Sequence, residues 1–220
     1  MKKLIIEHSH DTESPREWSN LGIIAYKHSK YKLGDELINE DPIDYLLNLY
    51  GLDPDRFMTN RVYCNETLSE VIKMADKYGF VLLPVYLYDH SGQSISTKPF
   101  SCNWDSGQVG FIYANLKMCN DVGFEWKKWT KKRKDKIKNY LEGEIKTFNQ
   151  YVSGEVYSFT IEEDGEIIDS CCGFYGDNPL TNGMAEHIDI ELLNQYIEEN
   201  NIQLNIKDYM KLQKLQETIF

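Results

Sequence analysis

The sequence predicts an α+β fold: an antiparallel sheet of five or six strands with helices packed mainly on one face. Apolar residues make up 41% and charged residues 27% of the 220 residues, a composition typical of a globular chain. The clearest strand signal is a hairpin, in which two β-rich runs flank Asp164-Gly165. Strands and helices alternate only in part along the chain, and this order favours hairpins over parallel βαβ units.

Each element is expected from its own pattern. Runs rich in β-branched and aromatic residues predict strands at 3–8, 21–28, 80–89, 107–115 and in the hairpin at 155–176. Apolar residues at helical spacing predict helices at 41–50, 67–78, 127–153 and, in two pieces, 188–220. Asp41 and Pro42 suit the start of the first helix, whereas Gly79 and Gly154 follow helix ends. Pro84 indicates a bulge or a sheet edge in its strand.

The chain is expected to form an α+β core domain over residues 1–177, followed by a C-terminal helical segment over residues 178–220 that packs on the core or extends from it. No run is long and apolar enough for a membrane span, and the first residues lack the apolar stretch of a signal peptide. These features predict a cytoplasmic protein with no membrane partner.

The five cysteines indicate reduced thiols. Their number is odd and no C-x-x-C pair occurs, so neither a disulfide scaffold nor a zinc site of the usual spacing is expected. The adjacent Cys171 and Cys172 would point to opposite faces of a strand and could not hold one metal ion together without a bend. No cofactor is therefore predicted.

Charge is distributed unevenly along the chain. The formal net charge is −11, with −6 over residues 1–126, +6 over residues 127–154 and −11 over residues 155–220. The candidate partner-binding residues are Lys127, Lys128, Trp129, Lys131, Lys132, Arg133, Lys134 and Lys138. Such residues can contact phosphates and stack on bases. The alternative is a solvated helix face, because several of these lysines lie three or four residues apart.

The region from Glu155 onward carries 14 acidic and three basic residues. An acidic face of this kind can compete with nucleic acid for a basic groove on another protein, because such grooves respond mainly to charge pattern. Acidic surfaces are also common on soluble proteins, so charge alone does not distinguish the two roles.

The connection between the two central strands contains the residue types that an active site would need. If the protein is an enzyme, Cys102 is the candidate nucleophile, His90 its base, and Asp89 or Asp105 the group that orients the base. No family motif such as G-x-S-x-G surrounds Cys102.

The same loop has a structural interpretation. Its Asp, Ser, Thr and Asn side chains can bond their own backbone in turns, and Gly92 and Gly107 can supply unusual dihedrals. Phe100 and Trp104 are then expected to pack the loop onto the core. The lack of a nucleophile motif favours this interpretation.

A metal site near the N-terminus is a further candidate. His8 and His10 would lie on the same face of a strand, and Asp11, Asp89 or His90 could add a ligand. Two histidines alone do not distinguish such a site from histidines that face solvent or bond a loop.

Four segments of the chain form a recognisable set. They are SPREWSNLG at 14–22, YKLGD at 31–35, LPVYLYDHSGQSISTKPFSCNWDSGQVGFIY at 83–113 and VYSFTIEEDGEIIDSCCGFYGD at 156–177. Together they resemble an uncharacterised family of small proteins encoded by phages, prophages and plasmids. In that family a Trp usually follows the single Cys before Gly-Phe-Tyr-Gly, whereas here Cys172 occupies that position. The resemblance implies a mobile-element setting, in which small acidic accessory proteins often inhibit host defence systems.

The leading hypothesis is therefore an accessory protein of the phage or mobile-element type. It is expected to inhibit a host nucleic-acid-handling protein, such as a restriction or CRISPR nuclease, through charged surfaces. Two alternatives are a Cys- or metal-dependent hydrolase that uses the Asp89–Asp105 loop, and a nucleic-acid binder that uses the Lys127–Lys138 helix. The charge pattern favours a binding protein over an enzyme.

Overall fold

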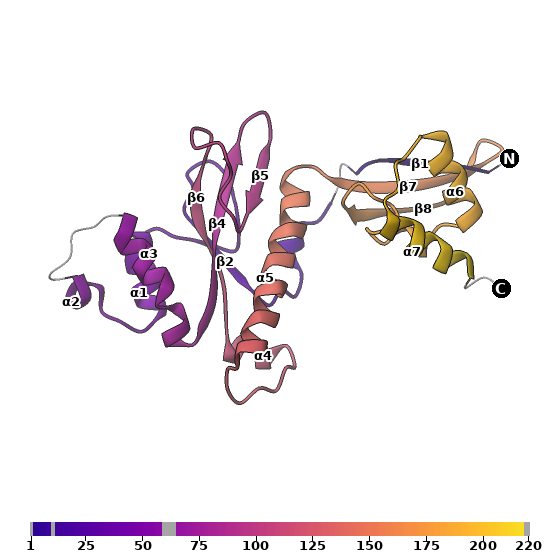
Figure 1. Cartoon of the computed structure of the whole chain (residues 1–220). Coiled ribbons are helices and arrows are strands. Elements are labelled where there is room, and N and C mark those ends of the chain that lie inside the picture. The colour runs from indigo at the N-terminus through magenta and orange to yellow at the C-terminus, as the bar shows by residue number, and fades with distance from the viewer. Residues whose placement is uncertain (1, 10–11, 59–64, 218–220) are drawn as a thin grey trace. The chain divides into compact units, whose positions relative to one another are not determined.

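The computed structural model describes residues 2–9, 12–58 and 65–217, and its mixed helix and strand content confirms the α+β class (Figure 1). The strands form two sheets, of three and five strands, where the sequence predicted a single sheet of five or six. The chain divides into two compact units. We call residues 15–149 the central unit, and residues 1–14 with 150–220 the terminal unit.

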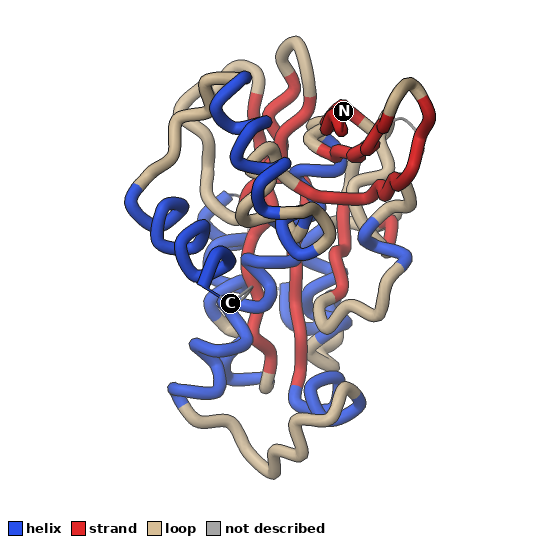
Figure 2. The backbone as a smooth tube through the Cα atoms, turned by 90° about the vertical axis from the view of Figure 1, so that its right-hand side faces the viewer, coloured by secondary structure: helices blue, strands red, loops and turns tan. Residues whose placement is uncertain are grey.

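The central unit contains the five-stranded sheet, in the order β3-β2-β6-β4-β5. Its strands are β2 (Ile23–Tyr26), β3 (Glu36–Leu37), β4 (Phe80–Asp89), β5 (Gln93–Ser96) and β6 (Ser106–Asn115). Neighbouring strands are antiparallel except β2 and β3, which are parallel. The long strands β4 and β6 pair along nearly their whole length and run side by side in Figure 2.

Pro84 lies in the part of β4 that β5 does not reach. β5 pairs with β4 only from Tyr86 to Asp89, and a β-bulge lies between Val85 and Tyr86. Proline has no backbone N–H to donate, so a strand accepts it where its outer edge is unpaired. Both features that Pro84 predicted, a bulge and an edge, are therefore present.

Helices cover both faces of this sheet, whereas the sequence predicted them mainly on one. The helices of this unit are η1 (Pro15–Glu17), α1 (Pro42–Leu49), α2 (Pro54–Met58), α3 (Asn65–Lys73), η2 (Ala75–Tyr78), α4 (Leu116–Asp121) and α5 (Lys131–Val152). Phe111 and Tyr113 of β6 pack in one core with α1 and α3. Ile112 faces α5, since a Cβ on Gly22 would meet both Ile112 and Leu141. Figure 1 shows the sheet between these helices.

The terminal unit contains the three-stranded antiparallel sheet, in the order β1-β7-β8. Its elements are β1 (Lys2–His8), β7 (Val156–Glu163), β8 (Glu166–Tyr175), η3 (Met184–Glu186), α6 (Ile190–Glu199) and α7 (Ile206–Glu217). The predicted hairpin turn is confirmed: Asp164 and Gly165 both have positive φ, and Glu163 pairs with Glu166.

This division differs from the predicted boundary at residue 177. β1 pairs with β7 along its whole length, from Lys2 with Glu163 to His8 with Tyr157. Leu193 of α6 is buried in the same core as residues of β1 and β7. The C-terminal helices therefore complete the terminal unit. No local pattern predicts a pairing between strands so distant in sequence.

No helix in the described part of the chain is both long and apolar enough to span a membrane.

Candidate functional site

The candidate partner-binding residues lie in the segment that leads into α5 and in the first turns of that helix. α5 begins at Lys131, later than the sequence predicted. The cause is local, because Asn120 accepts from the backbone N–H of Trp126 at 2.6 Å and donates to its carbonyl at 2.9 Å. Thr130 then caps the helix by accepting from the N–H of Arg133 at 3.3 Å.

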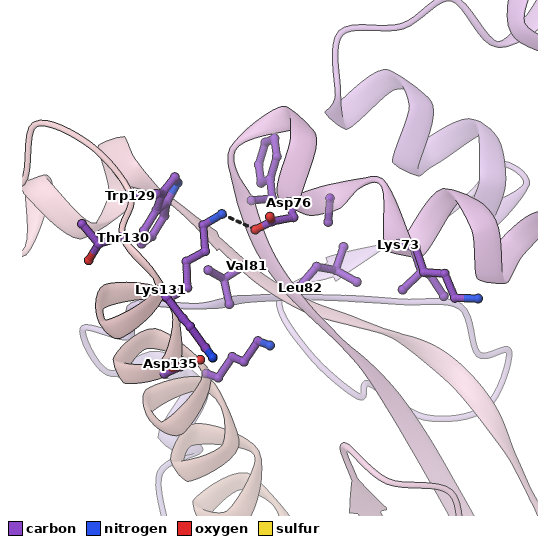
Figure 3. A pocket seen from close by; sticks show the side chains of 13 residues that line it. Lys73, Asp76, Val81, Leu82, Trp129, Thr130, Lys131 and Asp135 are labelled. Carbon is purple, nitrogen blue, oxygen red and sulfur yellow. Dashed lines mark hydrogen bonds and ion pairs between the residues drawn. The ribbon is translucent and has the colours of Figure 1, made fainter.

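Two of the candidate partner-binding cations already have partners within the central unit. Lys134 forms an ion pair with Asp76 of η2, which the dashed line in Figure 3 marks. Arg133 donates to the carbonyl of Lys128 at 2.7 Å, and its guanidinium lies 5.2 Å from the centre of the Trp126 ring. These contacts hold the start of α5 in place.

The other five candidate lysines are exposed and form no ion pair with any residue that the structure describes. They are Lys127, Lys128, Lys131, Lys132 and Lys138, and we call them the basic surface. Ammonium groups without an internal partner attract phosphates and carboxylates, and salt screens that attraction.

Trp129 makes a structural contact at the same place. Its indole N–H donates to the carbonyl of Gly79 at 2.9 Å, and its side chain is half-buried. Gly79 ends η2 and directly precedes β4, so this hydrogen bond joins the start of α5 to the start of that strand. The ring of Trp129 is thereby fixed.

A hollow of about 460 Å³ lies between η2, the start of β4 and the first turns of α5. Figure 3 shows Trp129 and Lys131 on its α5 side and Lys73 at the opposite end. Its apolar lining consists of Ile72, Ala75, Phe80, Val81 and Leu82. Its charged lining consists of Lys73, Lys131, Lys134, Lys138, Asp76 and Asp135.

Aromatic rings lie next to cations on the neighbouring face of α5. The Phe124 and Trp126 ring centres are 4.5 Å apart. The Lys136 ammonium lies 4.9 Å from the centre of the Phe124 ring and 5.8 Å from that of Tyr140. We call Phe124, Trp126 and Tyr140 the aromatic patch. Rings beside lysines are typical of surfaces that bind single-stranded nucleic acid, where bases stack on them.

The four candidate catalytic residues do come together, and Asp105 is at their centre. Its carboxylate oxygen Oδ2 lies 3.3 Å from Nδ1 of His90 and 3.6 Å from Sγ of Cys102. Its carbonyl accepts from the backbone N–H of Asp89 at 2.9 Å. The carboxylate of Asp105 therefore contacts both the imidazole and the thiol.

This order differs from that of a Cys-His-Asp triad, in which the imidazole contacts the thiol and removes its proton. The hydroxyl of Ser106 also bonds the carbonyl of Cys102, as expected of a loop that bonds its own backbone. One expectation for the loop is wrong: the Trp104 side chain does not pack on the core, since the residue is 96% exposed. Phe100 does pack, with its ring centre 5.6 Å from that of Tyr88.

The candidate metal ligands divide between described and undescribed parts of the chain. Nδ1 of His8 lies 3.0 Å from the carbonyl oxygen of Gly154, and its ring lies against Tyr157. His10 and Asp11 lie outside the described residues. Within residues 2–9, 12–58 and 65–217, no group of three or more His, Cys, Asp or Glu could hold a metal ion.

An ionic network beside β2 was missed at the level of sequence. Arg16 donates to both carboxylate oxygens of Asp35, at 3.0 and 2.6 Å, and to Glu144 at 2.9 Å. Only 6% of the Arg16 side chain and 14% of the Glu144 side chain are exposed. The two carboxylates also accept from backbone N–H groups at and just before the start of β2. The network thus fixes β2 to α5.

The chemistry of this network is structural. Burial by itself lowers the pKa of the Arg16 guanidinium, but the hydrogen bonds and charges of Asp35 and Glu144 outweigh burial and raise that pKa. Arg16 and Asp35 lie in the segments 14–22 and 31–35, before and after β2. Their partner Glu144 is far away in sequence, and no spacing signal could have revealed it.

A second polar cluster joins Tyr45 and Tyr113 to Glu36. The Tyr45 hydroxyl donates to the Glu36 carboxylate at 2.7 Å and lies 3.0 Å from the Tyr113 hydroxyl. Burial, helped by the charge of Glu36, raises the pKa of Tyr113 to about 12. Burial also raises the pKa of Tyr45. Neither hydroxyl is therefore a general base at neutral pH.

Comparisons of the chain with protein-family models, with curated proteins and with solved structures found no match.

Proposed function

We propose that this chain is an accessory protein of the phage or mobile-element type that inhibits a host nucleic-acid-handling complex, such as a restriction or CRISPR nuclease. The basic surface would contact the partner. One observation carries the proposal: five exposed lysines lie together at the start of a long helix and have no ion-pair partner among the described residues. Such a cluster is available to phosphates or carboxylates of another molecule.

The contacts behind the basic surface support a binding role. The start of α5 is held by the Lys134–Asp76 ion pair and by the Trp129–Gly79 hydrogen bond. Because the backbone beneath these lysines is already held, binding costs little backbone entropy, so more of the interaction free energy appears as affinity.

The distribution of charge gives a second line of support. Residues 155–220, which belong to the terminal unit, carry a net charge of −11. Four acidic residues at the β7–β8 hairpin, Glu163, Asp164, Glu166 and Asp169, are exposed. An acidic unit of this kind can compete with nucleic acid for a basic groove on the partner. The family resemblance to mobile-element proteins agrees with this role.

The experiment is a cleavage assay with purified restriction and CRISPR nucleases, in the presence and absence of the protein. The test variant is Lys127→Glu/Lys128→Glu/Lys132→Glu. The control has the same change in net charge elsewhere in the central unit: Lys32→Glu/Lys98→Glu/Lys117→Glu. We expect the test variant to need at least about tenfold more protein for the same inhibition, because several charge-assisted contacts are lost, while the control inhibits like the wild type.

The proposal fails if the wild-type protein inhibits none of these nucleases. It also fails if both triple variants lose inhibition to the same extent, since the effect would then reflect total charge.

A second candidate function is direct nucleic-acid binding, which the aromatic patch beside the basic surface favours. The expected signature is binding of a labelled single strand that weakens steeply as salt rises, because bound counterions are released. The triple test variant should flatten that salt dependence. An affinity that is nearly independent of salt would exclude this function.

The hydrolase alternative is tested at Cys102 and His90. Any turnover by the wild-type protein that disappears in both Cys102→Ala and His90→Ala, with unchanged melting temperatures, would support catalysis in the loop. We expect no such turnover, because Asp105 and not His90 contacts the thiol.

A further inference from the structure

The hollow between η2, β4 and α5 has a concave shape and an apolar wall. Binding to a large partner through charges would require neither. The volume of the hollow, about 460 Å³, lies within the range of small-molecule sites, roughly 300–1,000 Å³. It combines an apolar wall with several ammonium groups. A flat electrostatic contact would need the ammonium groups alone.

The charges around the hollow suit a ligand with more than one negative charge. Lys134 is paired with Asp76. Lys73, Lys131 and Lys138 are exposed and form no ion pair with a described residue. These three ammonium groups come from two elements, α3 and α5, so they surround the hollow instead of forming one row.

The apolar wall suits a flat, weakly polar group. Ile72, Phe80 and Leu82 line the hollow and are only half-buried, so part of their apolar surface is open to a ligand. The Trp129 ring, fixed by its bond to Gly79, forms one side (Figure 3). Contact between an aromatic ring and a nucleobase is favourable and tolerates any base.

We propose that this hollow binds a nucleotide, with the base against the apolar wall and Trp129 and with the phosphates among Lys73, Lys131 and Lys138. Two kinds of ligand offer a base with phosphates: a free nucleotide, and the 5′-phosphorylated end of a nucleic-acid strand. The proposal does not rest on the inhibitor function, because it concerns the purified protein and a small ligand alone.

Calorimetric titration of the full chain with ADP, adenosine and pyrophosphate tests the two halves of the site. ADP is expected to bind more tightly than either of the others, since only ADP engages both the wall and the ammonium groups. Pyrophosphate binding as tight as that of ADP would overturn the assignment of the wall to a base. If neither ADP nor a 5′-phosphorylated strand gives a heat of binding at millimolar concentrations, the whole proposal is overturned.

Charge variants in and just before the first turns of α5 localise the site. Lys131→Glu/Lys138→Glu should weaken ADP binding by about tenfold or more, because two charge-assisted contacts become repulsive. The matched control, Lys127→Glu/Lys132→Glu, carries the same charge change on residues that do not line the hollow. At physiological salt, where screening acts over about 8 Å, it should weaken binding by less than about threefold. Equal losses in the two variants would mean nonspecific attraction and would overturn the site.

A variant that binds ADP more tightly provides a test that misfolding cannot mimic, because a misfolded protein would bind more weakly. Asp135 is exposed and lines the hollow, and its carboxylate repels a phosphate. Asp135→Asn should therefore bind ADP about threefold more tightly, as expected when one like charge near an exposed site is removed. Unchanged or weaker binding would contradict phosphate placement in the hollow.

The source of the nucleotide is decided with short strands. A 5′-phosphorylated pentanucleotide and its 5′-hydroxyl counterpart are titrated beside ADP. Tighter binding of the phosphorylated strand than of ADP identifies a strand end as the ligand, and the reverse order identifies a free nucleotide. If the 5′-hydroxyl strand binds as tightly as the phosphorylated one and more tightly than ADP, the hollow is not a nucleotide site.

Discussion

Arg16 is a charged residue whose side chain is buried in the central unit. Its guanidinium bridges Asp35 and Glu144, and only 6% of its side chain is exposed. Removing one member of a buried ionic network leaves its partners as unpaired buried charges. That loss usually costs more than the pair itself contributes.

We therefore expect Arg16→Ala to lower the free energy of unfolding by about 3–5 kcal/mol, measured by urea denaturation. Arg16→Lys should recover only part of this loss, because an ammonium group cannot donate to both carboxylates in the geometry of the guanidinium fork. A loss below about 0.5 kcal/mol in Arg16→Ala, the size of an ordinary surface substitution, would show that the network is not structural.

Two substitutions of Trp129 test whether its side chain anchors the start of α5. Trp129→Phe keeps a ring but removes the indole N–H that bonds Gly79. We expect a loss of about 1 kcal/mol in unfolding free energy, the usual value for one hydrogen bond. Trp129→Ala should lose more, because part of the side chain is buried. Full stability in both variants would mean that Trp129 does not anchor α5.

Tyr113 predicts how stability depends on alkaline pH. Its pKa is raised to about 12 by burial, whereas an unfolded tyrosine titrates near its usual value of about 10. Between these values the unfolded chain releases a proton that the folded chain retains, so stability falls as pH rises. This tyrosine contributes a slope of at most about 1.4 kcal/mol per pH unit.

Tyr113→Phe should therefore flatten the loss of stability between pH 10 and pH 12, as measured by urea denaturation at each pH. Below pH 9 the curves of stability against pH for the variant and the wild type should run parallel, because Tyr113 is neutral there in both the folded and the unfolded chain. Identical slopes for the two proteins above pH 10 would contradict the raised pKa of Tyr113.

At the scale of elements, the caps decide where helices begin. Asp189 caps α6 by accepting from the N–H groups of Glu191 at 2.9 Å and Leu192 at 3.3 Å. Asp189→Ala should cost about 1 kcal/mol of unfolding free energy, and Asp189→Asn, which keeps the acceptor, clearly less. Equal losses in thermal or urea unfolding of the two variants would show that the cap is not the cause.

The start of α5 shows how a local contact overrides a helical pattern. Residues 127–130 have helical spacing, but Asn120 holds Trp126 and the Thr130 cap sets the first turn after it. Lys127 and Lys128 therefore precede the helix. The lysine spacing alone could not show this, because capping depends on side-chain contacts more than on apolar periodicity.

At the scale of the whole molecule, each unit has its own hydrophobic core. Phe111 is buried with α1 and α3 in the central unit, and Phe159 is buried with α6 in the terminal unit. Phe159→Ala should cost about 3–5 kcal/mol and raise amide exchange in β1, β7 and α6. Phe111→Ala should raise exchange in β4 and β6 instead.

Mass spectrometry after hydrogen exchange distinguishes these patterns. If either substitution raised exchange to the same extent in both units, the chain would unfold as one cooperative body, contrary to the division into two cores.

Much of the local structure was predictable. The Asp164-Gly165 turn, the Pro84 irregularity and the Asp41 cap each rest on the backbone chemistry of one or two residues, and each is confirmed. The candidate catalytic set was predicted to gather in one loop, and it does. Which side chain would contact the Cys102 thiol was not predictable, because the path of the loop backbone decides which of these side chains meet.

By itself the sequence determined the α+β class, most helices and strands, the uneven charge and the lysines of the basic surface, because these follow from composition and short-range pattern. The tertiary structure decided which charges remain available, since Lys134 is paired with Asp76 and Arg16 with Asp35 and Glu144 only after distant segments meet. It also decided that β1 joins β7 and that a hollow forms beside α5. Burial and long-range pairing create these features, and neither leaves a local pattern in the chain.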